Sequence, residues 1–437
     1  MVNNFERVQP LLPCTAGVDG DRLVVGGCDT LELAERFGTP LVVLDRATFE
    51  TRAGAFCVAL SPDQVFYAAK AFCCVAACEL AENLGLGLDV CTDGELATAI
   101  TAGFPPPRMI LHGNNKSARE LEVARDVGVG RVVVDSFQEL DRIARARLST
   151  KLLVRVTPGI EAHTHSFIQT GQEDSKFGFG WAEAFEAVER TAAIPGCELI
   201  GLHAHIGSQI FEPTPFELAI ELLAGFAAKL RGALGLELKE LNLGGGFGIS
   251  HSPDEMTLEP EVSVPRMLNK VTREFSERGV AIPQLFLEPG RAIVGAAGVT
   301  LYTVGTVKRV PGARTYVSVD GGMSDNIRPA LYGARYEAVV AGRMGDPPIA
   351  RMTVAGKHCE SGDVLIEDAH LPENTHPGDV LCIPATGAYS FSLASNYNRV
   401  ARPAVVMVED GTAIEIVARE TTGDLVGRDR RLNGSRP

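Results

Sequence analysis

The stretch "QVFYAAKAF", residues 64–72, places a lysine directly after a short apolar run. Val65 to Ala69 are typical of a buried β-strand, because strand-forming residues lead into small apolar ones. A lysine at the end of such a strand is costly to bury unless it has a partner. The stretch therefore predicts a core strand with Lys70 as a candidate functional amine at its carboxyl end.

The same pattern recurs downstream, where short apolar runs alternate with segments of helical periodicity that often end at glycine. Eight repeats of this size are typical of an α/β fold, a (β/α)8 TIM-type barrel. A doubly wound open sheet is the alternative, but it usually has fewer strands. The runs are "VFYAAK" (65–70), "GLGLDV" (85–90), "RMILHG" (108–113), "RVVVDS" (131–136), "LLVRVT" (152–157), "ELIGLHAHIG" (198–207), "ELNLGG" (240–245) and "QLFLEPG" (284–290).

Each run tends to finish in a residue that can bind or react. In a barrel the carboxyl ends of the strands converge on one mouth, so these residues are expected to face a common site. Polar residues can also simply mark where a strand stops, but that reading fits the whole set poorly. The set is Lys70, Asp89, His112, Asp135, Arg155, His205, the glycines from Gly244 and Glu288.

After Thr300 the pattern changes to β-like runs separated by Gly, Pro and Asp turns, which predicts a mostly antiparallel β domain. Two early runs, "RLVVGG" and "PLVVLD", are expected to join its sheet. The predicted organisation is N-terminal strands of the β domain in 1–45, the barrel in 46–300, the C-terminal β domain in 301–420 and a frayed tail in 421–437.

Charge and composition narrow the function. The 437 residues carry a formal net charge of -14, which disfavours nucleic acid and anionic membrane surfaces as partners. No secretion signal or membrane-spanning run is visible. The ten cysteines include no CxxC pair, so we expect reduced thiols, a cytoplasmic location and no structural zinc.

Three consecutive glycines in "LNLGGGFGI" follow a predicted strand, where exposed backbone N–H groups could receive an anion. Taken alone, the three glycines are more simply explained by a tight turn. The spacing matches neither a dinucleotide fingerprint nor a P-loop. In "LEPGRAIVG", Gly290 and Arg291 begin a segment that could be helical and could add donors for a phosphate.

Two histidine pairs have the spacing of metal ligands, His163–Thr–His165 and His203–Ala–His205. A metal-dependent barrel hydrolase could use such pairs with a carboxylate. That reading leaves Lys70 and the glycine run without a role, so no metal is expected.

Ten motifs, in order from about residue 40 to 410, together resemble the fold type III pyridoxal-phosphate decarboxylases. Each motif alone is weak, whereas ten in sequence are highly specific. The motifs are "FYAAKAF", "GLGLDVCTDGE", "HGNNKS", "DSKFGFG", "GLHAHIGSQI", "LNLGGGFGI", "LEPGR", "VDGGMSDNIRPALYG", "GKHCESGD" and "ATGAYSFSLASNYN".

The resemblance implies pyridoxal 5'-phosphate as cofactor and a barrel joined to a β domain. Lys70 would bind the cofactor covalently, its pKa lowered by apolar surroundings. Glu288 would pair with the pyridine nitrogen, and His205 would stack on the ring. The remaining cofactor contacts implied are Asp89 and Glu95 on the Lys70–His205 side, with Ser208, Gly245, Gly246, Gly290, Arg291 and Tyr389 at the phosphate.

The resemblance also implies a homodimer with shared active sites, because the "GKHCESGD" loop would enter the site of the other subunit. Cys359 in this loop would protonate the carbanion left by decarboxylation. An isolated cysteine without this motif would more often be inert packing.

Within the family the motifs are most similar to those of the enzymes that convert meso-2,6-diaminopimelate to L-lysine and CO2, the last step of lysine biosynthesis. A distal carboxylate calls for a guanidinium, and a distal ammonium calls for an acid. Arg328, Tyr332, Arg291, Tyr389 and Glu360 are the candidate substrate contacts. A related decarboxylase acting on ornithine, lysine, a carboxylated polyamine or a carrier-bound amino acid remains an alternative, and so does a non-catalytic cofactor carrier.

Overall fold

The computed structural model describes residues 4–160 and 175–436. The chain forms two compact units. The barrel unit consists of Ala53–Gly248 and Thr257–Gly290; the sheet unit consists of Met1–Arg52, Ile249–Met256 and Arg291–Pro437. Each unit is described by itself.

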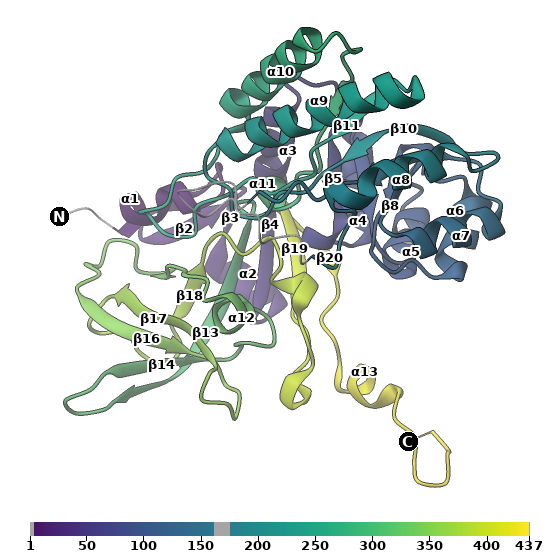
Figure 1. Ribbon diagram of the computed structural model, residues 1–437. Helices are drawn as coiled ribbons and strands as arrows, with labels where there is room; N and C mark the ends of the chain where they lie inside the picture. The colour runs from purple at the N-terminus through teal and green to yellow at the C-terminus, as the bar shows by residue number, and fades with distance from the viewer. Residues whose placement is uncertain (1–3, 161–174, 437) are drawn as a thin grey trace. The chain divides into compact units, whose positions relative to one another are not determined.

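The barrel unit contains an eight-stranded parallel sheet in which every strand pairs with its neighbour in the chain (Figure 1). An isolated parallel bridge between Val65 and Leu287 joins the first strand to the last and closes the barrel. All eight predicted runs form strands, so the (β/α)8 prediction is confirmed. The strands are β5 (Phe66–Ala68), β6 (Gly87–Val90), β7 (Met109–Leu111), β8 (Arg131–Val134), β9 (Lys151–Arg155), β10 (Glu198–His203), β11 (Glu240–Asn242) and β12 (Gln284–Phe286).

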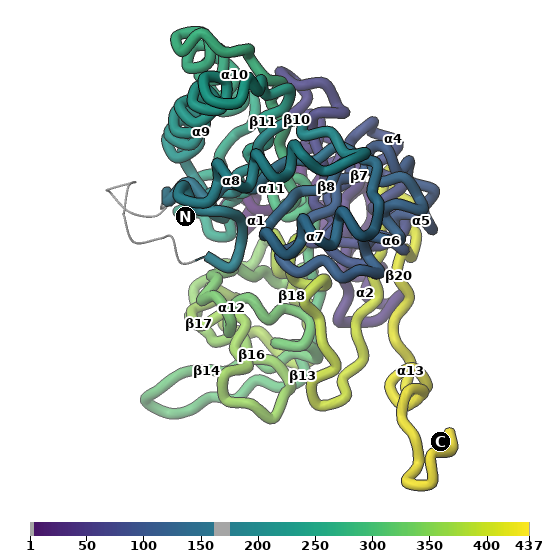
Figure 2. Tube along the Cα trace, turned by 45° about the vertical axis from the view of Figure 1, so that its right-hand side comes forward, coloured from purple at the N-terminus to yellow at the C-terminus, as the bar shows by residue number. Residues whose placement is uncertain are grey.

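The helices between these strands begin and end at recognisable sequence signals. In α6, Ser117 and Glu120 form a capping box, and Gly128 ends the helix in the left-handed conformation. Figure 2 shows α9 and α10 running side by side, where Lys270 and Glu221 form an ion pair at 2.9 Å. The helices are α4 (Val75–Asn83), α5 (Asp93–Thr101), α6 (Ala118–Val127), α7 (Phe137–Ala146), α8 (Trp181–Ala192), α9 (Thr214–Leu234) and α10 (Pro260–Glu277), with α3 (Arg46–Phe56) at the boundary of the unit.

Apolar side chains from six of the eight strands form a buried cluster in the barrel: Phe66, Ile110, Val133, Leu153, Ile200 and Phe286. At the opposite end of the strands from their carboxyl termini, Arg131 forms a two-pronged pair with Glu240 at 2.8 and 2.7 Å. The Arg131 guanidinium also lies 5.4 and 5.1 Å from the rings of Phe66 and Phe286. Side chains therefore fill the amino end of the barrel, and the candidate functional residues lie at the carboxyl end.

The sheet unit is built on β4, β13 and β19, which pair around the centre of its main sheet. Most pairs are antiparallel; β14 with β16 and β4 with β19 are parallel. Along the main path the order is β17-β16-β14-β13-β4-β19-β20, and β18 pairs with β13 and β15. The bounds are β4 (Leu41–Asp45), β13 (Gly298–Arg309), β14 (Thr315–Val319), β15 (Val339–Val340), β16 (Ala350–Ala355), β17 (Val364–Leu371), β18 (Val380–Ile383), β19 (Ala404–Glu409) and β20 (Thr412–Val417).

Two expectations about this unit need correction. "PLVVLD" does enter the main sheet as β4, but "RLVVGG" becomes β2 (Arg22–Val25) of a separate sheet with β1 (Gly17–Asp19) and β3 (Cys28–Asp29). A strand's own residues do not specify its partner, and β1 and β3 are its nearest neighbours in the chain. The tail also contains a helix, α13 (Thr422–Gly427), because Thr421 and Asp424 form a capping box. The other helices are α1 (Asn4–Val8), α2 (Thr30–Phe37), α11 (Arg291–Val294) and α12 (Arg328–Tyr332).

Of the residues that the structure describes, none belong to a helix that is both long enough and apolar enough to cross a membrane.

Candidate active site

Lys70 lies just beyond the carboxyl end of β5, in a short 3-10 helix, Ala69–Ala71. Its Nζ is 4.0 Å from Oδ2 of Asp89. The side chain is 47% exposed, so the apolar surroundings expected for it are not what the structure shows. The flanking residues Ala69 and Ala71 are both buried, so only the lysine of this short helix is exposed.

Glu288 follows β12 and is only 6% exposed. Its carboxylate accepts three hydrogen bonds from three different strand ends: from Nε2 of His112 at 2.8 Å, Nε2 of His203 at 3.0 Å and Nδ2 of Asn242 at 2.8 Å. Asn242 in turn accepts the backbone N–H of Gly244 at 2.8 Å. The three donors fix the carboxylate and tie it to the glycine run.

These contacts settle the ionisation of Glu288. Burial alone would raise the pKa of this carboxyl, but the imidazoles of His112 and His203 outweigh burial and hold it well below its usual range. Burial lowers the pKa of His203 to about 4 despite Glu288. At neutral pH the site therefore holds an ionised carboxylate beside a neutral imidazole that donates one N–H.

Asp89 lies in β6 and is 1% exposed. Burial raises its pKa, although His112 and Lys70 oppose the shift. Its Oδ1 has no hydrogen-bond partner among the described residues and lies 3.9 Å from Nε2 of His112. Glu95 accepts the backbone N–H of Cys91 at 2.6 Å, and burial raises its pKa as well. Asp89 and Glu95 thus form an acidic side of the site near Lys70.

His205 belongs to the same mouth. Removal from water, followed by the positive charge of Lys70, holds its pKa well below the usual range. The ring lies against the glycine run, since a Cβ built on Gly244 would come within 2.9 Å of its Nδ1. A neutral, flat imidazole is suited to stacking on an aromatic ligand.

The remaining strand-end residues brace the mouth. Arg155 lies 3.5 Å from Asp135, which also accepts the backbone N–H of Gly178 at 2.5 Å.

Lys116, in the loop after β7, pairs with Glu139 of α7 at 2.6 Å, and both side chains are inaccessible to solvent. The Lys116 amine also donates to the carbonyls of Gly113 at 2.8 Å and Val133 at 2.6 Å.

The glycine run is a cradle in which any side chain would collide. Gly244 and Gly246 have φ of 65° and 105°. A Cβ on Gly245 would lie 2.4 Å from the carbonyl of Glu288, and one on Gly246 would lie 2.5 Å from the carbonyl of Gly207. Gly290 is equally constrained, since its Cβ would meet Ala71 at 2.9 Å. A tight backbone approach is therefore required on both sides of the mouth.

These groups fit pyridoxal phosphate. The cofactor needs an amine for its aldehyde, an anion for its ring nitrogen and close backbone for its phosphate. A carboxylate can accept about four hydrogen bonds, and the chain supplies three to Glu288. One acceptor position is thus left for a ring N–H. Ser208 is exposed beside the Gly207 turn that meets the cradle.

Several candidate residues lie in the sheet unit. The guanidinium of Arg291 lies 4.7 Å from the ring centre of Tyr389. Burial, followed by the charge of Arg328, lowers the pKa of Arg291 to about 10. Arg328 is buried, whereas Tyr332 on the same helix is 66% exposed. The predicted helix after "LEPG" is α11, which is only four residues long.

The "GKHCESGD" loop presents Cys359 and Glu360 at the surface. Buried Asp363 braces the loop by accepting the backbone N–H groups of Met323 at 2.6 Å and His358 at 2.8 Å. The N–H of Cys359 donates to Oδ1 of Asn398 at 3.1 Å. The thiol and the acid therefore stand on a fixed backbone, open to another molecule.

Residue patterns alone missed two partners of Glu288. His203 was expected only as half of a metal-ligand pair, and Asn242 had no assigned role. Both stand at the very ends of their strands and are 1% exposed, so the signal was a polar residue completing an apolar run. The ligand atoms of His112, His203 and Glu288 lie within 4.8 Å of one another, but their spacing is that of hydrogen bonds. His163 and His165 lie outside the described residues.

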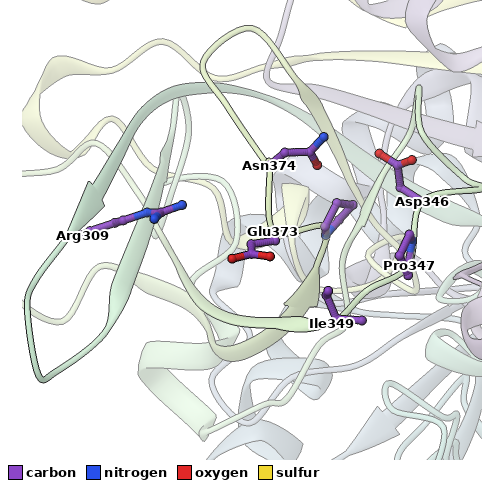
Figure 3. A pocket seen from close by; sticks show the side chains of 7 residues that line it. Arg309, Asp346, Pro347, Ile349, Glu373 and Asn374 are labelled. Carbon is purple, nitrogen blue, oxygen red and sulfur yellow. The ribbon is translucent and has the colours of Figure 1, made fainter.

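A pocket of about 450 Å³ in the sheet unit is unrelated to these groups. Figure 3 shows Arg309, Asp346, Glu373 and Asn374 around it. None of the residues predicted for the site line this pocket.

Comparison with known proteins agrees with this chemistry. A sequence model of the pyridoxal binding domain of pyridoxal-dependent decarboxylases matches residues 46–295. Diaminopimelate decarboxylase of Halalkalibacterium halodurans is 48% identical, over 96% of this chain and 98% of the relative. The Bacillus subtilis enzyme of that name is 49% identical, over 93% and 95%. Diaminopimelate decarboxylase from m. jannaschii in complex with L-lysine matches with a TM-score of 0.89 and 30% identity, over 96% of this chain and 98% of that one.

Proposed function

The chain belongs to the pyridoxal-dependent decarboxylases, and on that premise we propose that it decarboxylates meso-2,6-diaminopimelate to L-lysine and CO2. Pyridoxal phosphate, when bound, supplies an electron sink for the carbon–carbon bond that breaks. The observation that carries the proposal is Glu288, a buried carboxylate held ionised by donors from three strand ends. An anion in this place keeps a pyridine nitrogen protonated, which strengthens the sink.

The other residues of the barrel mouth bind and orient. Lys70 offers the amine for the cofactor aldehyde, and the Asp89 carboxylate lies 4.0 Å from that amine, within ion-pair distance. His205 would cover one face of the ring. Ser208, Gly245, Gly246, Gly290, Arg291 and Tyr389 would hold the phosphate end, and Glu95 would support the acidic side.

The substrate's far end carries a carboxylate and an ammonium. We propose that Arg328 and Arg291 bind the carboxylate, with Tyr332 and Tyr389 beside it, and that Glu360 pairs with the ammonium. A substrate such as ornithine has a distal ammonium without a carboxylate, so buried guanidinium groups would disfavour it.

We propose that the enzyme is a homodimer in which Cys359 and Glu360 of one copy complete the site of the other. The exposure of both residues on a braced loop supports this arrangement. The Cys359 thiol would deliver its proton to the α-carbon after CO2 leaves.

All ten cysteines are free thiols in the structure, which supports a reducing, cytoplasmic setting.

The first experiment measures CO2 release from meso-diaminopimelate, ornithine and lysine by the purified holoenzyme. We expect turnover of diaminopimelate alone. Lys70→Ala should lose both activity and the visible absorption of covalently bound cofactor. Equal turnover of ornithine would replace the proposed substrate, and an active Lys70→Ala variant would remove the proposed mechanism.

The second experiment tests the shared site by mixing two inactive variants, Lys70→Ala and Cys359→Ala. Random exchange of subunits gives half mixed dimers, each with one intact site, so activity should return to about a quarter of the wild-type value. No recovery in a mixture shown to exchange subunits would contradict the shared site.

A further inference from the structure

His251, Arg328 and Tyr336 form a buried cluster in the sheet unit, each no more than 4% exposed. Nη1 of Arg328 lies 2.8 Å from Nε2 of His251 and also donates to the Tyr336 hydroxyl. The rings of His251 and Tyr336 meet edge-on with centroids 5.3 Å apart. One nitrogen of the guanidinium, Nη1, is therefore held by two groups that carry no negative charge.

The charge of Arg328 is not balanced within the cluster. A buried arginine is normally paired with a carboxylate, yet none lies within ion-pair distance of Arg328 among the described residues. Its Nε is buried and has no hydrogen-bond partner in the same part of the chain. Arg291 is close enough for the charge of Arg328 to lower its pKa. Two positive groups thus lie together, as an anion would require.

His251 accepts rather than donates toward Arg328, because a guanidinium can only donate. Its proton must then be on Nδ1, which faces Oε2 of Glu255 at 3.9 Å. Burial, followed by the charges of Arg328 and Arg291, lowers the pKa of His251 to about 3. Glu255 itself faces Arg335 at 3.7 Å. The imidazole therefore remains neutral at physiological pH.

We propose that His251 is a positioning residue for substrate specificity: it holds Arg328 with an uncharged acceptor, so that the full positive charge remains available to the distal carboxylate of the substrate. This inference rests on the proposed function. A carboxylate at position 251 would fix Arg328 equally well but would neutralise it. The neutrality of the side chain, and not its hydrogen bond alone, is then the property that matters.

The test compares three variants that separate the charge of the side chain at position 251 from its hydrogen bond to Arg328. His251→Gln keeps a neutral acceptor, His251→Asp supplies a negative one, and His251→Phe supplies none. We expect His251→Asp to raise KM for meso-diaminopimelate by about tenfold or more with a smaller change in kcat, because one charge pair is lost. His251→Gln should stay within about threefold of wild type, and His251→Phe should fall between them.

A binding measurement separates a charge effect from general damage. L-lysine and 1,5-diaminopentane share one chain and differ by a single carboxylate. The wild type and His251→Gln should bind L-lysine more tightly than 1,5-diaminopentane, and His251→Asp should lose most of this preference, keeping only what Arg291 supplies. The control is His370→Asp, which adds the same charge at an exposed position of the same unit. It should change the affinity for neither L-lysine nor 1,5-diaminopentane.

The outcomes distinguish the two proposals. If the wild type releases no CO2 from diaminopimelate, the proposed function fails. If the wild type is active and His251→Asp, folded by its thermal melt, keeps both KM and the preference for L-lysine, the role of His251 is wrong. If His251→Gln is as impaired as His251→Asp, neutrality is not the deciding property and the inference also fails.

Discussion

At the residue scale, the ionised state of Glu288 depends on the hydrogen bond that Asn242 donates to its carboxylate. A carboxylate in a site this dry tends to take up a proton, and hydrogen-bond donors prevent that. Of its three donors, only Asn242 also reaches the glycine run. One side chain therefore couples the ionisation of the acid to the shape of the cradle.

Replacing Asn242 with aspartate should raise the pKa of Glu288, because a second carboxylate would then share its site. The acid limb of the kcat/KM profile should move to higher pH. Activity at neutral pH should fall by about tenfold or more, the usual cost of losing a hydrogen bond to a charged group. Asn433→Asp, in the exposed tail, is the control. An unshifted acid limb would show that Asn242 does not set this ionisation.

At the element scale, the turn after β11 needs glycine for two separable reasons, backbone angle and space. Gly244 has φ of 65°, and Gly235 at the end of α9 has φ of 66°. A Cβ on Gly244 would lie 2.9 Å from His205, whereas one on Gly235 meets nothing within 4 Å. The two positions thus share the angle and differ in the space.

Gly244→Ala and Gly235→Ala should therefore cost similar backbone strain, about 1 kcal/mol. Only Gly244→Ala should also weaken cofactor binding, by displacing the His205 ring. Equilibrium dialysis of pyridoxal phosphate against both apoenzymes measures this difference. Equal affinities would mean that the cradle tolerates a side chain.

The buried pair Lys116–Glu139 links the loop after β7 to α7 and β8. Lys116→Met should lower the free energy of unfolding by about 3–5 kcal/mol, because it leaves a carboxylate buried without its cation. Adding Glu139→Gln should restore much of the loss, since the remaining acceptor can still serve the N–H of Asp135. Urea unfolding measures both variants.

Arg231→Ala is the matched control, because its pair with Glu237 is exposed. It should cost about 1 kcal/mol or less. If the double variant is no more stable than Lys116→Met, the unpaired charge is not the cause of the loss.

At the scale of the whole molecule, the buried histidines should each make the fold less stable as the pH falls below 6.5. Burial lowers the pKa of His203 to about 4 and that of His251 to about 3, from an ordinary value near 6.5. As pH falls below 6.5 the unfolded chain binds protons that the folded chain refuses. Each histidine should then remove about 2 kcal/mol by pH 5, at 1.36 kcal/mol per pH unit.

Thermal melts at successive pH values check this expectation. Between pH 6.5 and 5, His203→Gln should lose less stability than the wild type. This difference separates the histidine from buried acids such as Asp89, whose raised pKa acts in the opposite direction. Glu288 acts at lower pH: its folded pKa is depressed, so its contribution is present above the ordinary carboxyl pKa and lost as pH falls through the folded value. The same pH dependence of the melting temperature in the wild type and in His203→Gln would contradict the neutral, buried state of His203.

The fold could be predicted because each barrel strand is a short apolar run that is recognisable from its own residues, as "RVVVD" is in β8. The convergence of strand-end residues followed from barrel geometry. What could not be predicted was pairing across the barrel: nothing near Asn242 indicates that it bonds to Glu288. The exposure of Lys70 was also missed, because its apolar neighbours Ala69 and Ala71, which are themselves buried, suggested a buried lysine.

The Val65–Leu287 bridge has a consequence for how the enzyme is made. It joins the first barrel strand to the last, so Lys70 and Glu288 become neighbours of one mouth only when the ring is complete. A nascent chain that ends before β12 contains Lys70 but lacks Glu288, the carboxylate that would help to retain the cofactor. Stable retention of the cofactor should therefore begin only after β12 has joined the ring.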